Sequence, residues 1–145
     1  MSEVTAYQAL RKGIRQPRDR IERMENIVGT GWPDSNCCLS GVELWIEIKA
    51  PTEPKRRNTP LFGSNHRLSQ AQKNWFLMQR KAGGKAFIYI ETDKHRILMP
   101  AEFADGLNEM SVAKLLEHCC WFAPRKTQSI QWSLLRNVLV THYAK

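Results

Sequence analysis

The sequence lacks the features of a membrane protein and of a secreted one. None of its apolar runs approaches the roughly 20 residues that a membrane-spanning helix needs. The basic residues near the N-terminus are followed by no apolar stretch like that of a secretory signal peptide. The 145 residues contain neither internal repeats nor low-complexity tracts. We therefore expect a soluble cytoplasmic protein with one core.

The four cysteines lack the C-x-x-C spacing of common zinc sites. They form two adjacent pairs, Cys37-Cys38 and Cys119-Cys120. Without a secretion signal, a disulfide framework is not expected. We expect reduced structural thiols, with a zinc site assembled from both pairs as the alternative.

One stretch of the chain is almost without acidic residues. Residues 51–81 contain seven basic residues against Glu53 alone, whereas residues 1–50 contain seven of each sign. The stretch thus carries +6 of the formal net charge of +8. Such a basic patch favours binding to a polyanion, because Lys and Arg neutralise phosphates. A solvated charge run is the alternative.

The apolar pattern predicts an α/β (α+β) fold of a single domain. Residues 1–99 are expected to form the core, and residues 100–145 a helical C-terminal extension packed on it. The expected helices cover about 3–13 and 70–82, and the expected strands about 21–28, 43–49, 85–92 and 96–99, with a turn or bent strand at 29–33. Further helical segments are expected near 101–106, 111–121 and 129–142.

The strand over residues 43–49 carries charged side chains on one face. Its alternation places Leu44, Ile46 and Ile48 on one face, and Glu43, Trp45, Glu47 and Lys49 on the other. A central position would bury Glu47 and Lys49, and a buried carboxylate is costly unless it is paired or binds a cation. A lateral salt bridge is the simpler interpretation of this pair.

A second carboxylate is expected beside this strand. Asp34 lies thirteen residues before Glu47, in a segment bent so that a hairpin would return it alongside. Two carboxylates and Lys49 at one edge of a sheet suit a hard cation, because Mg²⁺ takes one or two protein carboxylates and shares its remaining positions with waters and a phosphate. The sequence therefore predicts a site for Mg²⁺, or Mn²⁺, at this edge.

The order and spacing of these residues resemble those of a known family. Pro33-Asp34, followed by Glu47-Ile48-Lys49, resembles the PD-(D/E)xK nuclease signature. An apolar strand carries the second element, and Leu68-Ser69 and Gln72 then open a helix before another apolar strand. This arrangement resembles archaeal-type Holliday junction resolvases and VRR-NUC domains. Over about residues 20–99 the chain also resembles small nuclease-like proteins of tailed bacteriophages.

The resemblance implies a restriction-endonuclease-like core, in which a central mixed sheet is flanked by helices, and a site that hydrolyses phosphodiester bonds. It makes Asp34 and Glu47 metal ligands, with the backbone carbonyl of Ile48 as a third. Lys49 would orient or polarise the attacking water, and Gln72 would orient Lys49 or the water. For Gln72, an ordinary position in the first turn of the helix is the alternative.

A further acidic ligand is expected from the family pattern. Glu3, on the first helix, and Glu25, on the first strand, compete for this role, and we rank Glu3 slightly ahead. A solvated first-turn acid that favours the helix dipole is the alternative for Glu3. Trp45 shares a face with Glu47, and we interpret it as core or a cleft wall rather than a base-stacking platform.

The loop after this strand is expected to emerge beside the metal site. Its basic residues, Lys55, Arg56, Arg57, His66 and Arg67, would then lie where a substrate backbone must lie. We expect them to bind phosphates without reading the sequence of the nucleic acid.

The sequence thus predicts a metal-dependent DNA endonuclease, structure-selective on branched DNA such as Holliday junctions, and phage-encoded, so that it works in the host cytoplasm. The alternatives are a nucleic-acid-binding module with a nuclease fold but little activity, and an exonuclease or RNA nuclease of the same chemistry. Two symmetric cuts in a four-way junction favour a homodimer. The C-terminal amphipathic helices could form its interface, or equally cover an exposed sheet edge.

Overall fold

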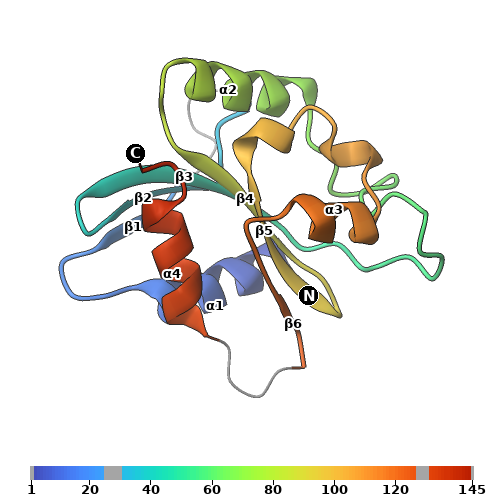
Figure 1. The fold of residues 1–145 in the computed structure, drawn as a ribbon, viewed down its shortest axis with the longest axis horizontal. Helices are drawn as coiled ribbons and strands as arrows, with labels where there is room; N and C mark the ends of the chain where they lie inside the picture. The colour runs from blue at the N-terminus through green and yellow to red at the C-terminus, as the bar shows by residue number, and fades with distance from the viewer. Residues whose placement is uncertain (1, 25–30, 127–130, 145) are drawn as a thin grey trace.

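A six-stranded mixed sheet forms the centre of the molecule (Figure 1). The computed structural model of the chain describes residues 2–24, 31–126 and 131–144. The strands follow one another across the sheet in chain order, and β3 and β4 run parallel while the other neighbouring pairs are antiparallel. The strands are β1 (Arg20–Arg23), β2 (Ser35–Leu39), β3 (Val42–Lys49), β4 (Ala86–Glu91), β5 (His95–Pro100) and β6 (Trp121–Pro124).

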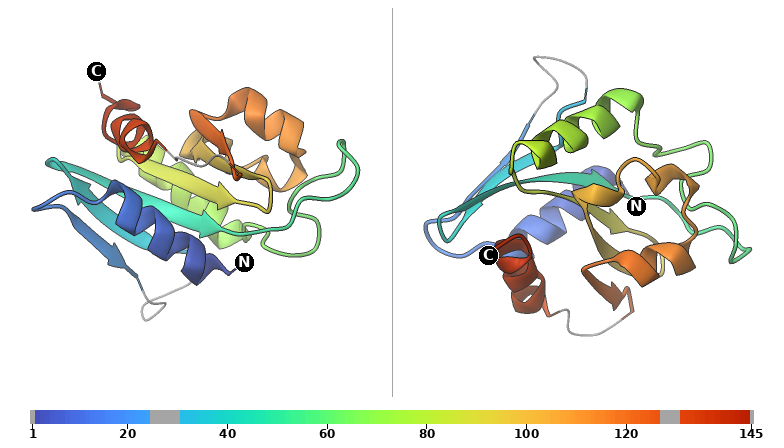
Figure 2. Two further views of the ribbon diagram at one scale, coloured as in Figure 1. Left: turned by 90° about the horizontal axis from the view of Figure 1, so that it is seen from below. Right: turned by 45° about the horizontal axis from the view of Figure 1, so that its top comes forward.

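Helices cover both faces of the sheet (Figures 1 and 2). They are α1 (Glu3–Ile14), α2 (Gln70–Lys81), α3 (Val112–His118) and α4 (Trp132–Thr141), with short 3₁₀ turns at Ala101–Phe103 and Leu107–Glu109. The helix α2 connects the parallel strands β3 and β4, as a parallel pair requires a crossover. The mixed sheet with flanking helices confirms the predicted α/β (α+β) class. In the described residues, no helix has the length and apolar character needed to cross a membrane.

The core has two halves, one on each face of the sheet. On one face, Ile46 and Ile48 of β3 pack in a buried cluster with Leu10 of α1 and Leu139 of α4. On the other face, a second cluster unites β4 and β5 with α2 and α3. The strand β3 is therefore covered on both sides. Its alternation is the predicted one, and burial of the face that carries Glu47 increases along the strand. Glu43 is exposed and Trp45 is half-buried, whereas Glu47 and Lys49 are buried.

The segment after residue 100 is not wholly helical, and the prediction for 111–121 is wrong at its end. Helix α3 ends at His118, and Trp121–Pro124 forms β6, which pairs antiparallel with β5 at the edge of the sheet. Aromatic side chains favour strands, but four residues are too few to show a period of two. Without this pairing, the outer edge of β5 would be exposed.

A buried ion pair joins α4 to the N-terminal part of the fold. The guanidinium of Arg136 donates hydrogen bonds to both oxygens of Asp19, to the hydroxyl of Ser40 and to the carbonyl of Ile14. Burial alone would raise the pKa of Asp19, but the hydrogen bond from Arg136 and those from backbone amides hold it below its ordinary value. This contact fixes the C-terminal helix on the sheet.

The cysteines are free thiols in the structure. One pair lies on β2 and the other between α3 and β6, and in the described part of the chain no three Cys, His, Asp or Glu side chains form a metal-binding group. The zinc alternative is therefore wrong for these residues. Burial raises the pKa of Cys37 to about 11, which keeps this thiol protonated and unreactive.

Candidate active site

Asp34 lies where the chain enters β2, beside the carboxyl-terminal half of β3. The antiparallel β2–β3 register pairs Ser35 with Ile46, so Asp34, which precedes Ser35, lies beside the residues that follow Ile46. There Oδ2 of Asp34 accepts a hydrogen bond from the backbone N–H of Ile48, at 2.8 Å. Burial raises the pKa of Asp34, and this amide hydrogen bond acts in the opposite direction. The predicted hairpin thus brings Asp34 to the Glu47-Ile48-Lys49 segment.

Glu47 is the most deeply buried charged group of the site, with 2% of its surface exposed. Its Oε2 accepts a hydrogen bond from Nε2 of Gln72 at 3.1 Å and lies 3.4 Å from Nζ of Lys49. Its other oxygen, Oε1, is buried and has no hydrogen-bond partner within the described residues. Burial and the negative charge of Asp34 raise the pKa of Glu47 to about 8, against the effect of Lys49.

Gln72 has two partners, one in its own helix and one in the site. In the capping box that begins α2, its Oε1 accepts the backbone N–H of Ser69 at 2.9 Å, and the hydroxyl of Ser69 accepts the N–H of Gln72. Its Nε2 is therefore directed at Glu47. Both interpretations of the sequence apply at once, because the helix-capping residue is also the residue that contacts the carboxylate.

The backbone of Ile48 faces the same side as Asp34. The N–H of Trp45 donates to the carbonyl of Lys85 on the β4 side. Because successive residues of a strand direct their backbone groups to opposite sides, Ile46 and Ile48 face β2. The β2 ladder begins at the pair of Ser35 and Ile46. The carbonyl of Ile48 therefore lies beyond that ladder, on the side occupied by the Asp34 carboxylate.

This set of oxygens fits a hard divalent cation. The half-buried carboxylate of Asp34 lies close enough to the buried carboxylate of Glu47 to raise its pKa, and Oε1 of Glu47 has no protein partner among the described residues. Both features cost free energy that a cation would offset. Mg²⁺ needs only one or two protein carboxylates, which agrees with the finding that no three acidic, His or Cys side chains form a metal group in the described residues.

Glu3 approaches the site from the first turn of α1. Its Oε2 lies 2.9 Å from Nδ1 of His66, in the loop between β3 and α2. Its negative charge contributes to the raised pKa of both Asp34 and Glu47, after the effect of burial. The structure therefore places Glu3 at the border of the site with His66 as its partner. Glu25, the alternative, lies outside the described residues.

No family model matches the sequence, and no curated protein matches it. Among solved structures, the chain is similar to Archaeoglobus fulgidus Hjc, a Holliday junction resolvase from an archaeal hyperthermophile. The TM-score is 0.52 at 16% sequence identity, over 79% of this chain and 88% of that chain. The chain has the nuclease-like fold of that resolvase. The resemblance to VRR-NUC domains and to phage proteins stays a prediction.

The basic loop, which connects β3 to α2 and carries the five predicted phosphate-binding residues, divides into two parts. His66 contacts Glu3 at the site, and Arg67 donates to the carbonyls of Phe62 and Gly63, which fixes the loop end. The other three basic residues line a pocket elsewhere. Its lining comprises Glu53, Pro54, Lys55, Arg56, Arg57, Lys94, His95, Val112, Ala113 and Leu116. The five basic residues that were predicted to act together therefore lie in two separate groups.

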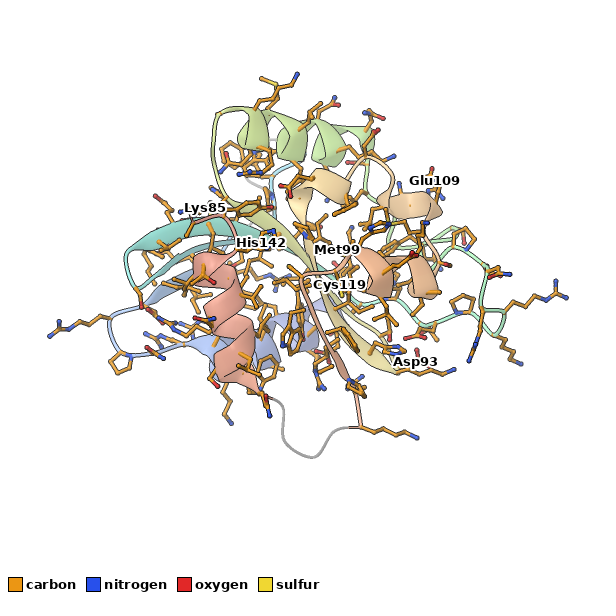
Figure 3. All side chains as sticks on the ribbon, viewed as in Figure 1. Lys85, Asp93, Met99, Glu109, Cys119 and His142 are labelled. Atoms are coloured by element: carbon orange, nitrogen blue, oxygen red, sulfur yellow. The ribbon has the colours of Figure 1, made fainter. Side chains whose placement is uncertain are left out.

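Sequence reasoning missed Lys94 and His95 as members of the second group. Lys94 lies in the turn between β4 and β5, next to Asp93 (Figure 3), and His95 is the first residue of β5. Nδ1 of His95 lies 2.6 Å from Oε2 of Glu53, and Oδ1 of Asp93 accepts the N–H of Glu53. These contacts fasten the start of the basic loop to the turn. About 40 residues separate the partners, so no local pattern could indicate the pocket.

Proposed function

We propose that the protein is an endonuclease that hydrolyses DNA with Mg²⁺ or Mn²⁺ and prefers branched substrates. One observation carries the proposal: the half-buried Asp34 binds the Ile48 amide beside the buried Glu47 and Lys49, and Oε1 of Glu47 has no partner among the described residues. The fold it shares with an archaeal Holliday junction resolvase supports a branched substrate.

In this proposal, Asp34, Glu47 and the carbonyl of Ile48 hold the metal. A bound divalent cation supplies neutralisation of the phosphate and a lower pKa for its water. Lys49, 3.4 Å from Glu47, orients the attacking water and stabilises negative charge at the phosphate. Gln72 positions the Glu47 carboxylate through the hydrogen bond from Nε2. Glu3 adds negative charge at the border, which favours the cation further.

Cleavage of a substrate panel tests the proposal. The wild-type protein is incubated with Mg²⁺, Mn²⁺ or EDTA on linear duplex, single strand, flap, fork and four-way junction of matched sequence. Cleavage that needs the metal and is fastest on the branched substrates is expected. Metal-dependent cleavage of duplex and junction at equal rates would contradict the preference for branches. Binding of all substrates with no cleavage under any metal would contradict the enzyme.

Replacing Lys49 with methionine is expected to slow cleavage by about 10²-fold while Mg²⁺ binding is retained, because the water loses its positioning group but the carboxylates remain. Single-turnover cleavage gives the rate, and titration calorimetry gives the metal affinity. Lys85→Met is the control, because Lys85 immediately precedes β4 and lies three residues before Ile88, the partner of Glu47 in the sheet. A Lys49→Met protein that cleaves within twofold of the wild type would exclude the role of Lys49.

The basic pocket is expected to bind the DNA backbone at a distance from the cut. The logarithm of the DNA-binding constant falls linearly with the logarithm of the salt concentration, by about 0.9 for each phosphate contact. Changing Lys55, Arg56 and Arg57 together to alanine should therefore make this slope less steep by about 2 to 3. Binding between about 50 and 200 mM salt measures the slope. A triple change at exposed residues near the ends of α1 and α2, Lys12, Arg15 and Lys81, is the charge-matched control. Equal slopes for both triple variants would show a solvated loop.

A further inference from the structure

Three tryptophan side chains pack against one another next to the carboxylates. The ring centroids of Trp32 and Trp45 are 5.4 Å apart, those of Trp45 and Trp75 are 5.3 Å apart, and those of Trp32 and Trp75 are 6.0 Å apart. Trp45 and Trp75 are partly buried against the core between the sheet and α2. Trp32, in contrast, exposes 44% of its surface. The cluster therefore presents one ring to solvent and supports it with two others.

The two supporting rings share their elements with residues of the candidate site. Trp45 precedes Glu47 by two residues on the same face of β3, which is a separation of about 7 Å along the strand. Trp75 follows Gln72 by three residues, on the same side of α2. Gln72 and Glu47 are themselves joined by a hydrogen bond. The aromatic cluster is thus continuous with the carboxylate site along both elements.

The chain that carries the exposed ring is held in place on either side of Trp32. Gly31 has φ of +100°, and a Cβ at this position would lie 2.8 Å from the carbonyl oxygen of Ala71 in α2. Only glycine permits this conformation and this approach together. On the other side, Pro33 is buried and Asp34 binds the Ile48 amide. Trp32 is therefore held two residues from a carboxylate that we propose as a metal ligand.

We propose that Trp32 is a stacking platform for an unpaired nucleobase adjacent to the phosphate that is cut. The inference rests on the proposed nuclease function and names what the site recognises. An exposed aromatic ring stacks on any base, because every base has a π-face. In a continuous duplex both faces of each base are already stacked, whereas a branch or a single-stranded arm frees a base at low cost. Trp32 thereby selects branched DNA without reading its sequence.

Binding in EDTA tests the platform without any need for cleavage. Fluorescence anisotropy compares the wild type, Trp32→Ala and Trp32→Phe on a labelled oligothymidylate of about 12 nucleotides, near the site size of single-strand binders. Trp32→Ala should bind about 5- to 150-fold more weakly, and Trp32→Phe should retain most of the affinity. On a duplex of equal length, both variants should match the wild type. Phe122→Ala, which removes an exposed aromatic ring from β6, is the control.

A forked substrate with one abasic nucleotide gives the decisive comparison. Removing the base at the first unpaired position should weaken wild-type binding and leave Trp32→Ala binding unchanged, so that the two losses are not additive. Additive losses, or an equal loss of Trp32→Ala on duplex and single strand, would overturn the platform and leave Trp32 as a structural or protein-binding residue. A nonadditive result without cleavage of any substrate would support the platform and contradict the nuclease.

Discussion

Replacing Asp34 with asparagine is expected to reduce the rate of DNA cleavage by about 10³-fold or more. The change removes one negative charge from the pair that we propose as metal ligands, while a carbonyl oxygen remains to accept the N–H of Ile48. The fold should therefore persist while metal binding fails. Single-turnover cleavage of a branched substrate, together with calorimetric titration of Mn²⁺, measures both effects.

Glu43→Gln is the matched control for this experiment. Glu43 is on the same strand and the same face as Glu47, but its side chain is 67% exposed and lies near Arg20 at the surface. The control should cleave and bind metal like the wild type. If Asp34→Asn retained its Mn²⁺ affinity and its cleavage rate, the carboxylate pair would be a structural feature and the proposed function would fail.

Replacing Arg136 with methionine is expected to destabilise the protein by about 3–5 kcal/mol, because it leaves Asp19 buried without its charged partner. In a chain of this size the melting temperature should fall by roughly 6–20 °C. Thermal unfolding followed by circular dichroism measures the change. A melting temperature within about 2 °C of the wild type, well below the expected fall, would show that the pair contributes nothing.

The same pair gives the stability a pH dependence. The folded pKa of Asp19 is below its ordinary value, so its contribution is present above the unfolded pKa, near 3.9, and is lost as pH falls through the folded pKa. Arg136→Met should remove this part of the loss of folding stability at low pH. In Asp19→Asn/Arg136→Met, no buried charge is left unpaired, and the double variant should regain part of the stability that the single variant loses.

The central part of the fold and the site could be predicted because the signals are local. The alternation over residues 43–49 identified β3 and the face of Glu47, and the capping residue Ser69 located the start of α2. Asp34 is joined to β3 by a short hairpin, so its position followed from the turn between the strands. Each of these inferences needed only residues close in sequence.

The parts that could not be predicted depend on contacts between distant residues. The pairing of His66 with Glu3 spans 63 positions, and that of His95 with Glu53 spans 42. These contacts separate the basic residues into a group at the site and a group at the β4–β5 turn. Strand β6 was missed for a different reason, since its four residues gain their order from β5.

The amide of Gln72 restricts which residues the chain can accept at that position. It must accept the Ser69 N–H to begin α2 and donate to Glu47 of β3. A glutamate would keep the first contact but place a further negative charge against Glu47, an asparagine would fall short of the strand, and a leucine would lose both contacts. One side chain therefore serves both the start of α2 and the candidate site. Fewer amino acids can replace Gln72 than if it made only one of the two contacts.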